Sequence, residues 1–254
     1  MSPYITQVPD PQAWQESWDR QQEAYMPDRE HRFAAMLDAV QAVADGSVTL
    51  LDLAGGTGSI SLRALDRLPD ADVTVLDLDP VTLAVARASL SGRATVVSAD
   101  LGDPGWTAAL PHRRYDAVLT ATALHWIEET RLATLYSEIH GLLRPGGIFV
   151  NADRMPDDDL PGLTARLTGR ADRVRDARYR AGTVLSWQDW WKRVTDDSVL
   201  GPLAAEREKL FPRADHNETL VPIGWHREAL RKAGFAEVGT LWRGGADAAV
   251  VSVA

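Results

Sequence analysis

The chain has 254 residues, which is enough for one folded core and a smaller subdomain at roughly 150 residues per domain. It has no cysteine, so a disulfide framework, a thiolate metal site and a thiol nucleophile are all excluded. A formal net charge of -9, no basic leader and no apolar run of about 18 residues predict a cytoplasmic protein that binds neither nucleic acid nor a membrane.

Residues 1–45 are expected to form an N-terminal helical lid. Apolar side chains recur at three- and four-residue steps over residues 33–44, which is the period of an amphipathic helix. The aromatic and basic side chains of this region either pack inside the protein or close over a ligand: Trp14, Trp18, Tyr25, Arg29 and Arg32.

Residues 46–152 and 222–254 are expected to form one α/β core. Seven short apolar runs predict strands: Val48–Ala54, Val73–Asp77, Thr95–Ala99, Tyr115–Thr120, Gly147–Val150, Glu237–Arg243 and Ala248–Val253. Helical stretches separate the first five runs, which favours a parallel sheet with helices on both faces. Gly244 and Gly245 join the last two, and a link that short predicts a hairpin.

Residues 153–221 interrupt this alternation of strands and helices and are expected to form a helical cap insertion. They contain no convincing strand. From Arg166 to Arg193 there are eight basic and three acidic residues, which form either a solvated helix face or a surface that recognises an acidic acceptor. Trp187, Trp190 and Trp191 either pack in the core or shape a pocket.

The strongest motif is the strand and glycine-rich turn from Leu50 to Gly58. Glycine lets the backbone turn sharply and approach a ligand, and the free N–H groups of the next helix face the crevice. The spacing G-x-G-x-x-G fits badly, whereas G-x-G-x-G fits with Ala54, Gly56 and Gly58. Asp77 ends the second strand, 21 residues after Gly56, where a carboxylate can accept both hydroxyls of a ribose.

On these residues the sequence resembles the class I S-adenosylmethionine-dependent methyltransferases. Further segments carry the resemblance: Asp100 and Leu101 after the third strand, Tyr115 to Trp126, Leu142 to Phe149, and the final hairpin. The resemblance implies a Rossmann-like, doubly wound, seven-stranded sheet with an antiparallel last strand, and S-adenosylmethionine as the cofactor. It implies these cofactor contacts: Tyr25, Arg32, Ala54, Gly55, Gly56, Gly58, Asp77, Leu78, Asp100, Leu101, Thr120 and Ala121.

Methyl transfer from a sulfonium depends mainly on positioning, and it needs a base only if the acceptor arrives protonated. His125, just beyond the fourth strand, is the first candidate base, although its ring can instead pack or cap a helix. His216, near the end of the insertion, is the second candidate. Trp126, Trp187 and Trp191 are candidate acceptor contacts, and we assign no metal site.

The sequence therefore predicts an enzyme that methylates a small organic molecule, most readily on oxygen or nitrogen. Two alternatives stay open, a nicotinamide-dependent oxidoreductase and a non-catalytic protein that binds S-adenosylmethionine. The glycine spacing and the final hairpin argue against the oxidoreductase. The acceptor and the oligomeric state do not follow from the sequence.

Overall fold

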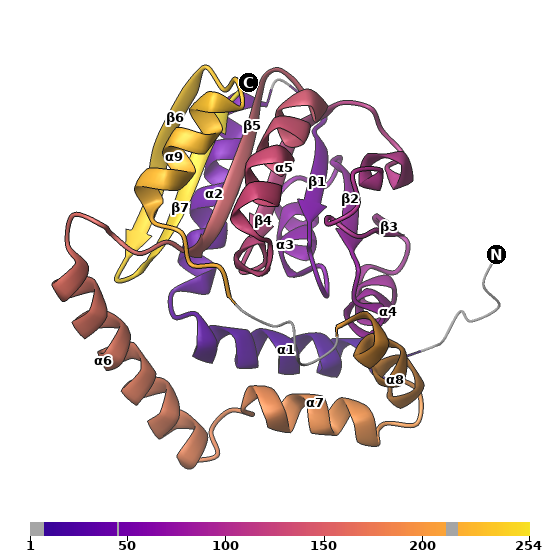
Figure 1. The fold of residues 1–254 in the computed structure, drawn as a ribbon. Helices are drawn as coiled ribbons and strands as arrows, with labels where there is room; N and C mark the ends of the chain where they lie inside the picture. The colour runs from indigo at the N-terminus through magenta and orange to yellow at the C-terminus, as the bar shows by residue number, and fades with distance from the viewer. Residues whose placement is uncertain (1–7, 45, 212–217) are drawn as a thin grey trace.

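A seven-stranded sheet forms the centre of the computed structural model, which describes residues 8–44, 46–211 and 218–254 (Figure 1). Its strands are β1 (Thr49–Leu53), β2 (Asp72–Asp77), β3 (Thr95–Ser98), β4 (Tyr115–Ala121), β5 (Leu143–Arg154), β6 (Glu237–Gly244) and β7 (Asp247–Val253). Their order across the sheet is β3-β2-β1-β4-β5-β7-β6. β7 runs antiparallel to both β5 and β6, and the other neighbouring pairs are parallel. The predicted fold, including the reversed last strand, is confirmed.

The strand order places a topological switch between β1 and β4. From β1 the chain moves outward to β2 and β3, and then returns to β4 on the other side of β1. The loops that follow β1 and β4 therefore diverge and leave a crevice at the carboxyl ends of the strands, where open α/β sheets bind ligands. The candidate site lies at this edge.

Apolar side chains on the two faces of the sheet belong to two separate clusters. On one face, α5 (Glu129–Leu142) and α9 (Ile223–Lys232) pack on residues such as Leu51 and Phe149. On the other, α2 (Arg29–Val43), α3 (Ser59–Arg67) and α4 (Pro80–Leu90) pack on residues such as Leu50 and Val150. Successive residues of one strand thus point to opposite faces, and burial on both explains why these strands read as continuous apolar runs.

The region predicted as one lid contains two helices with different positions. Asp28, at a left-handed φ of 65°, is the N-cap of α2, which follows α1 (Pro11–Tyr25) closely. The apolar side of α2 carries Phe33, Met36 and Val40 and lies on the sheet. Helix α1 instead crosses below the carboxyl ends of the strands (Figure 1). Only α1 is therefore placed to cover the crevice.

The insertion is helical, and it begins slightly later than predicted because β5 continues to Arg154 and pairs with β7 along that length. It contains α6 (Pro161–Arg180), α7 (Trp187–Asp196) and α8 (Gly201–Leu210). A third apolar cluster joins α7 and α8 to α1 and α4, so α1 lies between the sheet and α7 (Figure 1). Among the described residues, no helix has both the length and the apolar character needed to span a bilayer.

Candidate functional site

The turn between β1 and α3 is the base of the candidate site. Ala54, Gly56 and Gly58 all have positive φ, of 52°, 56° and 77°. Ala54 thus holds a left-handed conformation that favours glycine, at the position where the predicted pattern has its first glycine. A Cβ atom on Gly56 would meet nothing within 4 Å, so its backbone borders open space. This turn can receive a ligand close to its main chain.

Asp52 supports the turn from below, a role that the sequence did not reveal. It is fully buried and accepts hydrogen bonds from the backbone N–H and the hydroxyl of Ser61, at 3.1 and 2.7 Å. A Cβ on Gly55 would lie 2.6 Å from the Asp52 carboxyl carbon, so the close approach requires glycine there. Burial raises the pKa of Asp52 to about 6, although the bonds from Ser61 oppose the shift.

Helix α1 touches the turn directly through polar side chains. Gln15 donates to the hydroxyls of Thr57 and Ser59, at 3.0 and 2.9 Å. Asp19 accepts from Ser59 at 2.7 Å and forms an ion pair with Arg29 at 2.8 Å. Burial alone would raise the pKa of Asp19, but the charges of Arg29 and Arg63 hold it below its usual value. α1 is therefore fixed on the start of α3.

Asp77 lies at the end of β2 beside the turn, as predicted. Its two carboxylate oxygens accept from the backbone N–H groups of Gly56 and Asp79, each at 2.8 Å. Burial, together with the charge of Asp79, raises its pKa to about 6. Each oxygen has a second lone pair, so the carboxylate can still accept hydrogen bonds from a ligand.

The other residues predicted to contact the cofactor border the same edge of the sheet. Asp100 is exposed and accepts from the backbone N–H of Gly102 at 2.7 Å. Leu101 is buried, and its carbonyl accepts from Arg131 at 2.7 Å. Thr120, in β4, is fully buried, and its hydroxyl has no protein partner among the described residues. Leu78 follows Asp77, and Ala121 ends β4.

His125, just beyond the end of β4, forms a buried pair with Asp153 near the end of β5. Nδ1 of the ring lies 2.7 Å from one carboxylate oxygen, and the backbone N–H donates to the other at 3.2 Å. Burial would raise the pKa of Asp153, but the positive charge and the hydrogen bond of His125 keep it below its usual value. An ionised Asp153 keeps the proton on Nδ1, which leaves the Nε2 lone pair to accept another.

Trp126 contacts this pair, and a second buried histidine, His226, bonds to Tyr136 nearby. Trp126 is 50% exposed, and its ring centre lies 4.8 Å from that of His125. The backbone N–H of Thr219 donates to the carbonyl of His125 at 2.6 Å. His226 is buried with Nδ1 2.7 Å from the Tyr136 hydroxyl, and burial lowers its pKa to about 4. The ring of Trp126 is therefore the aromatic surface beside His125 that solvent reaches.

Tyr25 and Arg32, predicted near the cofactor carboxylate, have protein partners. The Tyr25 hydroxyl donates to Glu218 at 3.2 Å, and the guanidinium of Arg154 covers its ring at 4.4 Å. Arg32 is buried, donates to Asp247 at 2.6 Å and stacks on Trp242. The cofactor role of both residues stays a prediction.

The tryptophans of α7 form an aromatic cluster with α1. Trp190 is fully buried, with ring centres of Trp14 and Trp18 at 5.9 and 4.9 Å. Trp187 lies against Trp18 at 6.0 Å, and Trp191 against Trp187 at 5.6 Å. These contacts account for the packing of α7, and the acceptor role of Trp187 and Trp191 stays a prediction. His216 lies outside the described residues.

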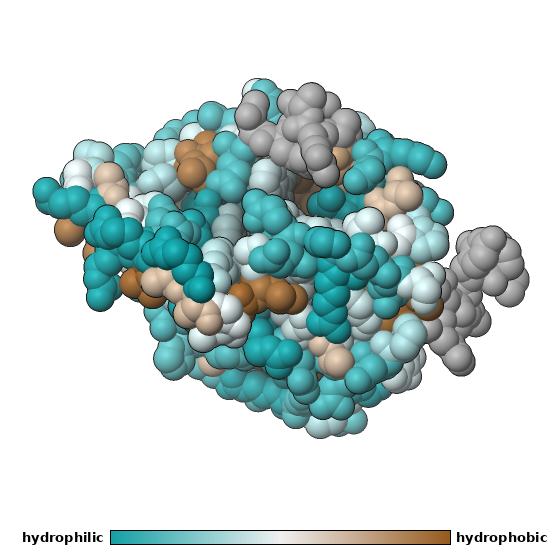
Figure 2. Space-filling model, turned by 90° about the horizontal axis from the view of Figure 1, so that it is seen from below, coloured by the Kyte–Doolittle hydropathy of each residue, from teal (hydrophilic) through white to brown (hydrophobic). Residues whose placement is uncertain are grey.

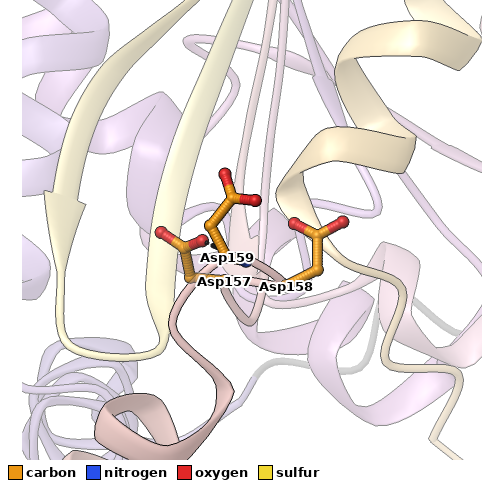
Figure 3. Close-up of side chains that lie close together, drawn as sticks. All are labelled: Asp157, Asp158 and Asp159. Atoms are coloured by element: carbon orange, nitrogen blue, oxygen red, sulfur yellow. Dashed lines mark hydrogen bonds between the residues drawn. The ribbon is translucent and has the colours of Figure 1, made fainter.

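Three consecutive carboxylates, Asp157, Asp158 and Asp159, gather in the connection between β5 and α6 (Figure 3). One ligand atom from each lies within 4.8 Å of the others. Asp157 already forms an ion pair with Arg243 at 2.9 Å and accepts from the backbone of Asp159. We assign no metal to this cluster, since adjacent exposed acids are common on protein surfaces.

Comparison with known proteins gives consistent matches. Residues 50–147 match the family described as a methyltransferase domain. Over 201 residues the chain is 31% identical to trans-aconitate 2-methyltransferase of Azoarcus sp. (strain BH72), covering 72% of this chain and 76% of that protein. It is also 31% identical over 145 residues to the ubiquinone/menaquinone biosynthesis C-methyltransferase UbiE of Methylobacterium nodulans, covering 57% of this chain and 53% of that protein. The chain thus spans about half the length of several curated relatives.

Solved structures share the fold at low sequence identity. Human N-acetylserotonin methyltransferase, solved in complex with S-adenosylmethionine, superposes with a TM-score of 0.57 at 17% identity, covering 94% of this chain and 57% of that chain. The S-adenosylmethionine-dependent methyltransferase SibL gives 0.58 at 21% identity, covering 88% of this chain and 55% of that one. At such identities the likeness concerns the fold alone.

Proposed function

This chain belongs to the class I S-adenosylmethionine-dependent methyltransferases, and on that basis we propose that it methylates an oxygen or nitrogen of a small organic acceptor, with His125 as the general base. The observation that carries the proposal is the buried pair of His125 and Asp153 at the carboxyl edge of the sheet. It gives a proton acceptor on the side of the sheet where the glycine turn lies.

The residues at this edge suit S-adenosylmethionine. Asp77 offers carboxylate oxygens to the two ribose hydroxyls, and the open backbone at Gly56 offers room for the chain that joins the ribose to the methionine. Asp100 and the backbone of Leu101 would contact the adenine. When bound, the cofactor supplies an electrophilic methyl group on a sulfonium. The protein's part is then to hold both reactants in line and to take up a proton.

His125 is arranged for that uptake. Asp153 keeps Nδ1 protonated and holds the ring through one hydrogen bond and the main chain of His125 through another, so Nε2 is the nitrogen that receives the acceptor's proton. The negative charge of Asp153 then stabilises the imidazolium. A base of this kind is useful for a hydroxyl, phenol or amine, which carries a proton at neutral pH, and not for a carboxylate, which is already ionised. Trp126 offers an aromatic surface for such an acceptor.

The relatives span more than one chemistry. One is named as a C-methyltransferase and another as a trans-aconitate methyltransferase, so their names do not select the methylated atom. The His125–Asp153 pair is what favours an acceptor that must lose a proton. Membership of this family removes the support for the oxidoreductase alternative. The experiment below distinguishes an enzyme from the non-catalytic alternative.

Two measurements test the proposal. Isothermal titration should show binding of S-adenosylmethionine that NAD does not compete with. Incubation with methyl-labelled cofactor and panels of phenols, alcohols, amines and carboxylic acids should yield S-adenosylhomocysteine together with a labelled acceptor. Binding without turnover on any panel would favour the non-catalytic alternative, and turnover on carboxylic acids alone would refute the role of His125 as a base.

A further inference from the structure

Helix α6 presents a polar face to the rest of the protein. Of its 20 residues, all within the described part of the chain, Thr164 alone is buried. The half-buried Asp172, Arg175 and Tyr179 follow Thr164 at helical spacing, on the same face. On this side the Arg175 guanidinium lies 5.8 Å from the ring of Tyr25 in α1. An ordinary surface helix does the reverse and turns its apolar face inward.

The apolar residues of α6 form a solvent-exposed stripe on another face. Leu160, at the N-cap, and Leu163, Leu167 and Val174 are 53%, 46%, 38% and 49% exposed. Three exposed alanines complete what we call the α6 stripe: Leu160, Leu163, Leu167, Ala171, Val174, Ala177 and Ala181. Hydrophobic side chains reach the surface on the side of the molecule where α6 lies (Figure 2). Exposed apolar patches of this kind mark interaction surfaces.

We propose that the α6 stripe is the interface of a homodimer, in which two copies of α6 pack antiparallel around a two-fold axis. The large and small side chains of the stripe can fit against each other when two copies meet. Its N-terminal half carries the three leucines, and its C-terminal half carries three alanines and one valine. In an antiparallel pair the leucines of each copy face the small residues of the other, as an isologous interface requires. A parallel pair would place leucine on leucine and leave alanine against alanine.

The charges at the ends of α6 favour the same arrangement. Asp158 and Asp159 are exposed just before the helix begins, and Arg178 and Arg180 lie in its last turn. An antiparallel pair brings the acidic end of one copy to the basic end of the other and opposes the helix dipoles. Arg170 lies within the stripe near its middle, three residues after Leu167, and its long aliphatic stem can lie along the leucines while the guanidinium reaches water.

A second copy explains the stripe better than a lipid surface does. An amphipathic helix that lies on an anionic membrane carries basic residues along its polar face. The polar face of α6 is mixed, with Asp172 and Asp176 between its arginines, and the acidic triad Asp157–Asp159 precedes it. The whole chain has a net charge of -9, which opposes approach to such a membrane.

Sedimentation equilibrium of the full chain tests the dimer. The wild type should show a reversible dimer, and Leu167→Glu should raise its dissociation constant by roughly 100-fold, because each dimer would bury two new charges. Ala165→Glu is the matched control, since Ala165 is exposed half a turn away from the stripe. A wild type that stays monomeric at every concentration, or equal weakening by both variants, would overturn the proposal. So would a monomer that cosediments with phosphatidylserine vesicles through Leu167.

A charge exchange tests the antiparallel orientation. Arg180→Glu alone should weaken the dimer, and the double variant Arg180→Glu with Asp159→Lys should restore it. Within one chain these two positions lie about 30 Å apart along the helix, so they cannot compensate each other inside one copy. Restoration therefore reports a contact between copies, and a double variant that dimerises no more tightly than Arg180→Glu would refute the antiparallel pairing.

Discussion

The carboxylate of Asp153 binds the same residue twice, with one oxygen 2.7 Å from the ring nitrogen Nδ1 of His125 and the other accepting from its backbone N–H at 3.2 Å. The ring and the main chain of His125 are thus held by one buried charge. The proposed base is fixed in position and in tautomer before any acceptor arrives, which is the condition for efficient proton transfer.

Replacing His125 by Ala should lower kcat by roughly 10²–10⁴, the contribution of a general base, with the affinity for S-adenosylmethionine almost unchanged. Initial rates with a hydroxyl or amine acceptor, and titration calorimetry for the cofactor, measure the two effects. His112→Ala is the control, because His112 pairs with Asp72 at the other end of β2. Near-normal turnover in His125→Ala would show that this histidine packs in the site and does not act as the base.

Asp153→Asn tests positioning separately from proton transfer. The amide keeps a similar shape and removes the charge, so the imidazolium that forms on proton uptake loses its stabilisation. We expect a reduced kcat with a hydroxyl or amine acceptor and an unchanged KM for the cofactor. A purely structural role would instead lower the melting temperature and leave kcat of the folded enzyme nearly unchanged.

Replacing Asp77 by Ala should weaken the binding of S-adenosylmethionine by about 2–3 kcal/mol, because two hydrogen bonds to a charged acceptor are lost and water replaces part of them. Titration calorimetry measures this, with Asp72→Ala as the control at the opposite end of the same strand. Since the pKa of Asp77 is raised to about 6, the affinity of the wild type should also fall as the pH decreases through 6. An unchanged affinity for S-adenosylmethionine in Asp77→Ala would show that Asp77 does not bind the ribose.

The site residues that the sequence alone could place at this edge are those that follow a recognisable strand. Ala54, Asp77 and His125 each come just after a β-branched or leucine-rich run, so short segments of sequence were enough to place them. Asp153 was missed because its role depends on pairing between strands. β4 and β5 pair in register up to Ala121 and Ala152, and only this register brings Asp153 beside His125.

The cap illustrates the same limit. The spacing of Trp187 and Trp191 indicates one helix face, but not that α1 covers it, because this contact joins segments far apart in the sequence. In α6 the periodic apolar pattern indicates a helix, and the usual rule that such a stripe faces the core is wrong here.

His226 should make the stability of the protein depend on pH. Burial lowers its pKa from 6.5 to about 4, so between these values the unfolded chain binds a proton that the folded chain does not. The free energy of unfolding contributed by this residue therefore falls as the pH decreases from 6.5 to 4, by about 3 kcal/mol in total at 1.36 kcal/mol per pKa unit. Urea denaturation at a series of pH values measures it.

The control for this prediction is the variant His226→Gln, which keeps a polar partner for Tyr136 but does not titrate. Asp52 and Asp77 have raised pKa values, so they act in the opposite direction over part of the same range. The quantity to follow is therefore the difference between wild type and variant. A difference that stays constant from pH 7 to pH 4 would contradict the prediction.

Two tryptophans of α7 should respond differently to substitution. Trp190 is fully buried among Trp14, Trp18 and Trp191, so Trp190→Ala should cost roughly 3–5 kcal/mol of stability. Trp187 is 40% exposed, and Trp187→Leu should leave the melting temperature nearly unchanged. A higher KM for the acceptor in Trp187→Leu would support its predicted acceptor contact, and an unchanged KM would remove it.

The pairing of β5 with β7 has a consequence for biosynthesis. β7 lies between β5 and β6, and its register with β5 runs from Ile148↔Val253 to Arg154↔Asp247. While a ribosome is still translating the insertion, β1 to β5 can already assemble, but the free edge of β5 then exposes unpaired backbone groups. A ribosome that stalls at that stage leaves an aggregation-prone nascent chain, because such edges pair readily with other polypeptides. Residues 237–253 close that edge only after the whole cap has been made.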